Sequence, residues 1–322
     1  DNEFIPIGKS EYERVPDGIA HFLEHKVFEQ KDGVDPFSFF SKNGADVNAY
    51  TSFYGTTYLF SGIEHFKENI QYLLNYVESP YFTDENVEKE KGIILQELKM
   101  HKDNPYRVGK IQLIENAFVH NSIRIPVIGT ESSIQAITKE NLYDCYYTFY
   151  HPSNMILVIT GNFNPEDALE YIKEIEETRA LEKQDEIQIK KEEEPDHVFQ
   201  AEQIIHQNVS IPKAFLGIKL NLTNLSKKYS KYMIRRYLHM YMNIQFGNTS
   251  LLQEQLINEN IINSEIEIDQ ISTDDHLLYI LFADTKKPEI LLDKMIEQLQ
   301  NQKIEEADFI RKKKLYLASN IS

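Results

Sequence analysis

Two histidines and one glutamate with helical spacing lie near the start of this sequence of 322 residues. At about 100° per residue, His21, Glu24 and His25 fall on one face of a helix, within roughly a quarter of a turn. Two neutral imidazoles four residues apart can bind one Zn²⁺, and a glutamate between them lies beside the metal without binding it. From that position a general base can accept a proton from water at the metal. The pattern predicts a metal site that needs a third ligand; the alternative is an ordinary helix with two partly buried histidines.

A second predicted helix, over Asp84–Lys102, carries two candidate ligands. Glu90 and Glu97 lie seven residues apart and fall inside the apolar stripe of that helix instead of on its charged face. The stripe consists of Val87, Ile93, Ile94 and Leu98. A buried carboxylate is costly unless a cation, a hydrogen bond or a metal compensates its charge. Internal salt bridges are the alternative to a metal, and His101, close to the same stripe, is a rival ligand.

The elements around these residues predict an α+β fold for residues 1–178, because strands and helices follow one another in separate runs. The alternating run from Asn48 to Thr51 and the run Thr57–Phe60 predict a hairpin, and the apolar run Met155–Ile159 has the length of a strand. Helical periodicity predicts helices over Glu64–Tyr81, Asp84–Lys102, Arg107–His120, Thr138–Tyr150 and Pro165–Thr178.

A polar and charged segment, residues 179–197, is interpreted as a linker with a short strand at Ile187–Ile189. Residues 198–322 are expected to form a second domain. Its apolar segments lie at 204–211 and 214–220, and helices are predicted at Lys227–Phe246 and Glu305–Ser322. We expect the first domain to be incomplete at its N-terminus and the second at its C-terminus, because little sequence precedes the histidine motif and nothing follows the last helix to complete a sheet.

Composition limits the classes of protein to which the chain can belong. Apolar residues make up 41% of the sequence, enough for two cores, and no apolar run approaches the ~20 residues that span a membrane. The formal net charge of −17 argues against nucleic acid as a partner, because phosphate binding needs a basic surface. The single cysteine, Cys145, is interpreted as a packed thiol. One cysteine cannot form an internal disulfide, which fits a reducing compartment, and we expect a cytoplasmic protein.

Taken together, the motifs resemble the pitrilysin/insulinase family of zinc peptidases with the inverted H-x-x-E-H motif, closest to its bacterial processing-peptidase-like members. The matching blocks follow the family's order over most of residues 1–178: GIAHFLEHKVFE (18–29), GADVNAYTS (44–52), VEKEKGIILQE (87–97), IGTESSIQAI (128–137) and FYHPSNMILVITGNF (149–163). The resemblance implies two related αβ sandwich domains, each with an antiparallel-rich sheet and helices on one face. Residues 1–178 would be the catalytic zinc-binding domain, and residues 198–322 the non-catalytic repeat.

Position by position, the resemblance implies that one Zn²⁺ per active site is bound by His21, His25 and Glu97. Glu24 matches the general base. Glu90 matches the carboxylate that orients a ligating histidine from outside the ligand set. The gap between His25 and Glu97 is a few residues shorter than usual in the family, which indicates a tighter connection between the two helices.

Asn48, Ala49, Tyr50 and Thr51 resemble the family's substrate-binding edge strand. In β-augmentation an extended peptide pairs its backbone with such a strand, and here it would lie across the metal. Without the family, a hairpin is the plain structural interpretation, and Asn48 is a polar residue next to a turn.

One departure from the family pattern indicates a partner. Family members often carry an arginine and a tyrosine in the second repeat that contact substrate across a closed chamber, whereas this sequence has Leu251 and Ser264 at the matching positions. In two-chain relatives the opposite subunit supplies that pair. The resemblance therefore implies a homologous second subunit in a heterodimer, with a homodimer as the alternative.

The function that the resemblance implies is a zinc-dependent endopeptidase that hydrolyses small peptides or unfolded segments inside a closed chamber, with Glu24 as general base. The alternative is a non-catalytic scaffold or a peptide-binding subunit of a larger complex. Because such proteins tend to lose the ligands or the base, the intact set in this sequence favours the enzyme.

Overall fold

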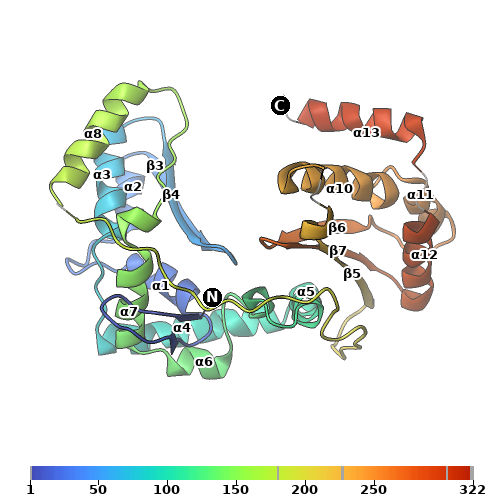
Figure 1. Cartoon of the computed structure of the whole chain (residues 1–322), viewed down its shortest axis with the longest axis horizontal. Coiled ribbons are helices and arrows are strands. Elements are labelled where there is room, and N and C mark those ends of the chain that lie inside the picture. The colour runs from blue at the N-terminus through green and yellow to red at the C-terminus, as the bar shows by residue number, and fades with distance from the viewer. Residues whose placement is uncertain (1, 180, 226–227, 302–303, 320–322) are drawn as a thin grey trace. The chain divides into compact units, whose positions relative to one another are not determined.

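The computed structural model describes residues 2–179, 181–225, 228–301 and 304–319 (Figure 1). The chain folds into two compact units, residues 1–100 with 125–192 and residues 101–124 with 193–322. Both units combine helices with small antiparallel sheets, which confirms the predicted α+β class.

The first unit contains the histidine motif. Its elements are β1 (Glu3–Phe4), β2 (Glu13–Arg14), α1 (Ile19–Val27), α2 (Pro36–Lys42), β3 (Ala45–Thr51), β4 (Thr56–Gly62), α3 (Phe66–Val77), α4 (Asp84–Lys102, whose last two residues group with the second unit), α6 (Glu131–Ala136), α7 (Lys139–Phe149), a short 3₁₀ turn (Pro152–Asn154) and α8 (Pro165–Glu177). Strands β1 and β2 form one two-stranded sheet, and β3 and β4 form another.

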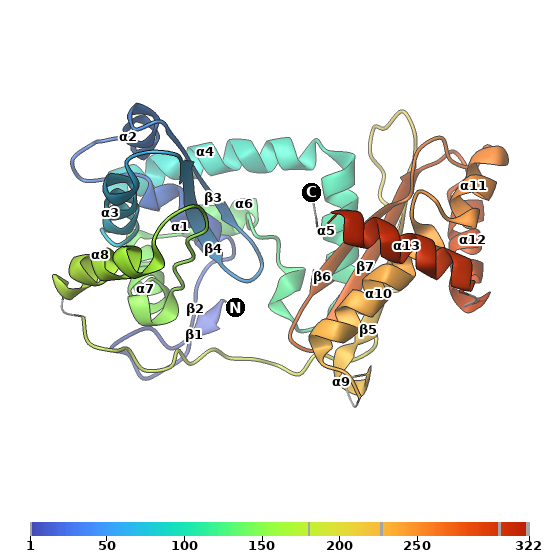
Figure 2. The same ribbon diagram turned by 90° about the horizontal axis from the view of Figure 1, so that it is seen from above.

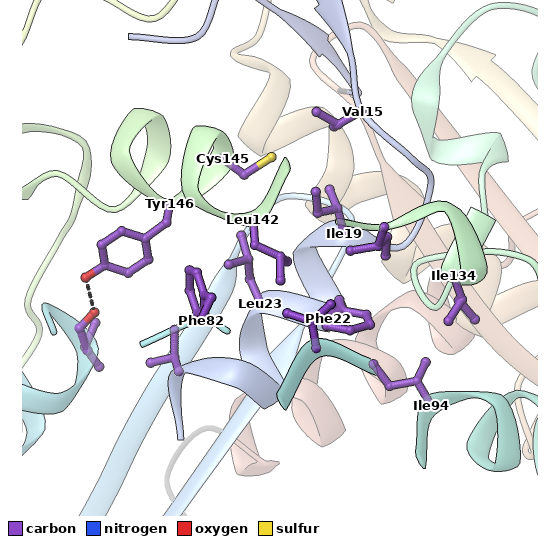
Figure 3. Packing of buried hydrophobic residues seen from close by; sticks show 14 of the residues in the cluster. Val15, Ile19, Phe22, Leu23, Phe82, Ile94, Ile134, Leu142, Cys145 and Tyr146 are labelled. Atoms are coloured by element: carbon purple, nitrogen blue, oxygen red, sulfur yellow. Dashed lines mark hydrogen bonds between the residues drawn. The ribbon is translucent and has the colours of Figure 1, made fainter. Parts of the chain in front are cut away.

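Helix α1 packs its apolar face into the core of the first unit (Figure 3). Phe22 and Leu23 are buried there beside Ile94 of α4 and Leu142 of α7. Burying one such side chain contributes about 1.5–3 kcal/mol of hydrophobic free energy. Because this face of α1 faces the core, the half-buried face that carries the two histidines and the glutamate is held toward α4 and the β3–β4 hairpin.

Helix α1 begins at a backbone position that only glycine occupies without strain. Gly18 precedes the helix with φ of +90°, and a Cβ there would lie 2.5 Å from the carbonyl oxygen of Ile128. Gly129 has φ of +81°, and a Cβ on it would lie 2.5 Å from the carbonyl oxygen of Asp17. The two glycines therefore permit a close approach of two backbone segments that fixes where α1 starts.

The β3–β4 hairpin lies beside α1, and α2 and α3 lie on one side of it in both views (Figures 1 and 2). Its strands pair from Ala45 opposite Gly62 to Thr51 opposite Thr56. The alternating burial of β3 is that of a half-buried strand and confirms the predicted hairpin.

Hydrogen bonds between side chains and the backbone fix where helix α4 begins. The Thr83 hydroxyl accepts from the Asn86 backbone N–H at 3.1 Å, and the Asn86 side chain accepts from the Thr83 backbone N–H at 2.9 Å. This reciprocal pair satisfies two backbone donors that the helix cannot satisfy itself. The helix then runs over the predicted residues Asp84–Lys102, and Glu90 is buried on the same side as Val87, Ile94 and Leu98.

The second unit is built around the three-stranded sheet β5–β7–β6. Its elements are α5 (Pro105–Ala117), a 3₁₀ turn (Ser122–Arg124), β5 (Lys213–Asn221), α9 (Leu222–Leu225), α10 (Lys231–Phe246), α11 (Leu251–Asn258), β6 (Glu267–Ser272), β7 (His276–Asp284), α12 (Pro288–Asn301) and α13 (Glu306–Ser319). In β7, Leu277, Tyr279 and Leu281 pack with α10 and α12, whereas Leu278 and Ile280 pack with α5. Helices therefore cover both faces of this central strand.

Most predicted helices occur within a few residues of their expected bounds. Arg107–His120, Thr138–Tyr150 and Pro165–Thr178 are α5, α7 and α8, and Glu64–Tyr81 is shortened to α3. The helix expected from Lys227 begins at Lys231 as α10, and the last helix is α13; Ala180, Lys227 and residues 320–322 lie outside the described part of the chain.

Two apolar segments form no strand. Residues 204–211 and the run Met155–Ile159 lack regular secondary structure, and Ile156 is 90% exposed. The strand expected at Ile187–Ile189 is a single bridge between Ile189 and Phe4. An apolar run becomes a strand only where a neighbouring backbone pairs with it, and in the described ranges neither of the two segments has such a neighbour.

No helix in the described ranges combines the length and the apolar character that crossing a membrane requires.

Replacing Gly18 by alanine is expected to destabilise the first unit, because the new methyl group meets the Ile128 carbonyl and the backbone φ is positive. Strain of this kind costs about 1–3 kcal/mol, measurable as a lower urea midpoint. Gly92→Ala is the matched control, since Gly92 is an exposed position in α4 with open space around it. Alanine there should stabilise by about 0.5–1 kcal/mol. Equal midpoints for the two variants would contradict the assigned role of Gly18.

Candidate metal centre

Side chains from two helices converge at the predicted site. The Nε2 atoms of His21 and His25, both on α1, each lie 3.6 Å from the Oε2 atom of Glu97 on α4. The two imidazole rings meet edge to face, with centroids 4.7 Å apart. In the part of the chain that the structure describes, this is the one group of three potential metal ligands, with one donor atom from each residue within 4.8 Å of the others.

The donor set fits a divalent transition metal. Two imidazole nitrogens and one carboxylate oxygen form a ligand set that zinc accepts with one coordination position left open. Tetrahedral zinc with bonds of about 2.0–2.2 Å places its ligand atoms roughly 3.4 Å apart, so the two 3.6 Å separations need only a small adjustment. All three residues are half-buried.

Glu90 orients one of the two histidines. Its Oε1 atom lies 3.0 Å from Nδ1 of His25, so Nδ1–H donates to the carboxylate and Nε2 is turned toward Glu97. Behind it lies Lys26, which is fully buried. The Lys26 ammonium is 4.0 Å from Oε2 of Glu90, donates to the Asn86 carbonyl at 3.3 Å and contacts Glu29. Glu90 thus has both a histidine and a cation as partners, and its burial does not leave a charge uncompensated.

The carboxylates also set the protonation of His25 in the metal-free protein. Burial disfavours the charged imidazolium, but hydrogen bonds and charge attraction from Glu90 and Glu97 outweigh burial and raise the pKa of His25 to about 9. His25 is therefore protonated at neutral pH in the metal-free protein.

Glu24 lies on the same face of α1 and is held from the hairpin. The Thr51 hydroxyl, at the end of β3, donates to Oε2 of Glu24 at 2.5 Å. Thr51 in turn is 3.1 Å from the Thr56 hydroxyl on β4. A hydroxyl group of the hairpin thus holds the carboxylate of the candidate base.

The remaining residues of the predicted substrate strand lie along β3. Asn48, Ala49 and Tyr50 pair with Leu59, Tyr58 and Thr57 of β4. Tyr50 is 55% exposed, and the Asn48 side chain accepts from the backbone N–H of Ala49 at 2.9 Å. In the described residues β3 has β4 as its only strand neighbour, so its other edge pairs with no strand there.

Two residues weighed from the sequence lie outside the site. The ring of His101 contacts the guanidinium of Arg107, and His101 is not in the ligand group. Cys145 is buried in the core of the first unit, and burial raises the pKa of its thiol to about 12, which agrees with a packed thiol.

Sequence analysis missed Lys26. The signal was available, because Lys26 lies four residues after Phe22 and so on the core face of the helix, where an unpaired charge would be costly. The bond from Thr51 to Glu24 was also missed, since it depends on how the hairpin lies against α1.

Two imidazoles and a carboxylate from two helices, with Glu24 on the same face of α1, form a candidate metallohydrolase site on an α+β fold. The family model described as Insulinase (Peptidase family M16) matches residues 4–131, and the model described as Peptidase M16 inactive domain matches residues 136–316. The chain belongs to the M16 family of metallopeptidases, as the resemblance had indicated.

Among its relatives, the uncharacterized zinc protease YmfH of Bacillus subtilis is 39% identical over 319 residues, which covers 99% of this chain and 73% of that protein. The crystal structure of an M16-like peptidase from Alicyclobacillus acidocaldarius superposes with a TM-score of 0.89 at 32% identity, covering 99% of this chain and 75% of that one. The mitochondrial-processing peptidase subunit beta of Bos taurus is 26% identical over 160 residues, covering 48% of this chain and 33% of that protein. Relatives named as zinc proteases imply zinc as the family's metal.

Removing the Glu97 carboxylate is expected to cost more zinc affinity than removing Glu90. Glu90→Gln should weaken binding about 10–100-fold, as loss of a residue that orients a ligand typically does, and Glu97→Gln should weaken it further. Competition with a chromogenic chelator measures both. Glu85→Gln is the control, because Glu85 is exposed on the first turn of the same helix. Equal affinities for wild type and Glu97→Gln would exclude Glu97 as a ligand.

Zinc uptake is expected to release a proton from His25. The pKa of His25 in the folded protein, about 9, lies above its ordinary value of 6.5, so its charged form stabilises the metal-free protein fully below pH 6.5, and this contribution is lost as the pH rises through about 9. Because zinc needs the neutral imidazole, binding between these pH values must displace that proton. Titration calorimetry at about pH 7.5, in two buffers of different ionisation enthalpy, should give close to one proton from His25 per zinc. Zinc binding without proton release would contradict the raised pKa.

Proposed function

We propose that the protein is a zinc-dependent endopeptidase that hydrolyses small peptides or unfolded segments. The observation that carries the proposal is the convergence of His21, His25 and Glu97 within 4.8 Å. It is supported by relatives that are named zinc proteases. When bound at such a site, zinc makes water more acidic and polarises a peptide carbonyl.

The chain's own residues supply the proton transfers. Glu24 accepts the proton of the attacking water and later delivers it to the departing amine. Its place on the same helical face as the two histidines supports that role. Glu90 keeps His25 in the tautomer whose Nε2 is available as a ligand, and Lys26 holds the Glu90 carboxylate in place.

A peptide substrate would bind by adding a strand to β3, along Asn48, Ala49 and Tyr50. The edge of this strand that pairs with no described strand and the exposure of Tyr50 support that mode, because backbone pairing recognises an extended peptide with little regard to its sequence. Selection in a closed chamber would then depend on size and on lack of folded structure. In this proposal residues 1–178 carry the chemistry, 179–197 connect the two parts, and 198–322 are the non-catalytic repeat.

A second, related subunit would complete the chamber. Leu251 is the first residue of α11 and is 73% exposed, and Ser264 is also exposed. Because of their residue types, neither position offers substrate a guanidinium or a phenol. A relative that is named as a subunit supports a two-chain assembly. A homodimer is the alternative arrangement.

Glu24→Gln is expected to abolish cleavage of a quenched peptide while the protein retains its zinc. Glutamine keeps the size and the hydrogen-bond acceptor of glutamate but cannot accept a proton, so the loss should reach at least the ~10²–10⁴-fold typical of general base catalysis. The assay is run on the chain alone and together with any chain that co-purifies with it.

Glu85→Gln serves again as the control and should cleave at the wild-type rate. A fully active Glu24→Gln variant would refute the assigned base, and full activity of the chain alone would remove the need for a second subunit. Zinc bound with wild-type affinity but no cleavage in either preparation would leave a peptide-binding subunit as the function.

A further inference from the structure

We propose that Thr51 is a positioning residue for Glu24: its hydroxyl fixes the carboxylate of the base and ties it to the strand that would bind substrate. The inference rests on the proposed function and deepens it, because it gives Thr51 a task in the chemical step in place of the substrate contact expected from the sequence.

The bond itself has the geometry of a strong, charge-assisted hydrogen bond. The Thr51 Oγ1 atom lies 2.5 Å from Oε2 of Glu24, at the short end of the range for a hydroxyl that donates to a carboxylate. A half-buried threonine has few rotamers open to it, since branching at Cβ restricts χ1. The hydroxyl is therefore a firm anchor for a glutamate side chain that would otherwise be free to rotate about three bonds.

The donor direction of this bond is also determined. A threonine hydroxyl has one proton and two lone pairs, and Thr51 gives its proton to Glu24. In the 3.1 Å contact with Thr56, the Thr56 hydroxyl must then donate to Thr51. Because Thr51 and Thr56 are paired across the hairpin, this second bond holds the donor in place from the neighbouring strand.

The location of Thr51 links substrate position to base position. Residues 48–50 of β3 would pair with the peptide, and Thr51 is the next residue of the same strand. A peptide bound in register on β3 is thereby placed at a fixed distance from Glu24, whereas a base held by another element could shift relative to the strand. Proximity and orientation of this kind are worth large factors in rate.

The test compares Thr51→Val, which keeps the shape but removes the hydroxyl, with Thr51→Ser, which keeps the hydroxyl. Zinc-loaded protein should show a kcat about 10–100-fold lower for Thr51→Val, the usual loss for a partner that orients a reacting group, with KM and zinc content unchanged. Thr51→Ser should recover most of the rate. Thr57→Val is the matched control, because Thr57 is an exposed threonine on the same hairpin, and it should match wild type.

Three outcomes would overturn the proposal. In the first, Thr51→Val keeps its kcat. In the second, KM rises with kcat unchanged, which would assign the hydroxyl to substrate binding. In the third, Thr51→Ser is as impaired as Thr51→Val, which would assign the loss to packing.

A measurement without turnover separates this inference from the proposed function. Thermal midpoints of metal-free Glu24→Ala, Thr51→Val and the double variant should be non-additive, because the two side chains share one bond. Additive shifts would overturn the positioning role whether or not the protein cleaves peptides. If the shifts in thermal midpoint are non-additive but the wild type cleaves no peptide, the endopeptidase proposal is refuted. The contact between Thr51 and Glu24 is supported in that case.

Discussion

The burial of a carboxylate on α4 is the constraint on which the rest of the site depends. Glu90 lies in the apolar stripe of its helix and would be costly there alone. His25 on one side and Lys26 on the other compensate its charge, and both are on α1. The two helices are therefore joined by charge as well as by apolar packing, and the geometry that satisfies Glu90 also brings Glu97 to the two histidines.

The division of α1 into two faces explains how a metal site can be built without weakening the core. Phe22 and Leu23 fix the helix in the core. The candidate ligands lie on its other face, so they take no part in that packing. The hairpin contributes a third contact, from Thr51 to Glu24. Helix α1, helix α4 and strand β3 thus each fix one part of the site. The proposed catalytic centre would need preorganisation of this kind.

Much of this arrangement could be predicted from spacing. The histidine motif and the two glutamates seven residues apart define faces of helices, and faces follow from periodicity alone. The contact between Thr51 and Glu24 could not be predicted, because it depends on how the hairpin lies against α1. The same holds for α5, whose periodicity predicts a helix but not that Leu113 and Ile114 pack under the sheet of the second unit. For the apolar run Met155–Ile159, the sequence predicted a strand that the structure lacks. A segment with strand propensity forms a strand only where it has a partner strand.

The close approach of Gly18 and Gly129 has a consequence for biogenesis. Because Gly129 follows Gly18 in the sequence, the helix with the two histidines is synthesised before the turn that fixes its first residue. A contact between such distant segments forms late, after the chain entropy of the long intervening loop has been overcome. A nascent chain that lacks the segment around Gly129 would therefore carry both imidazoles on a helix without a fixed start.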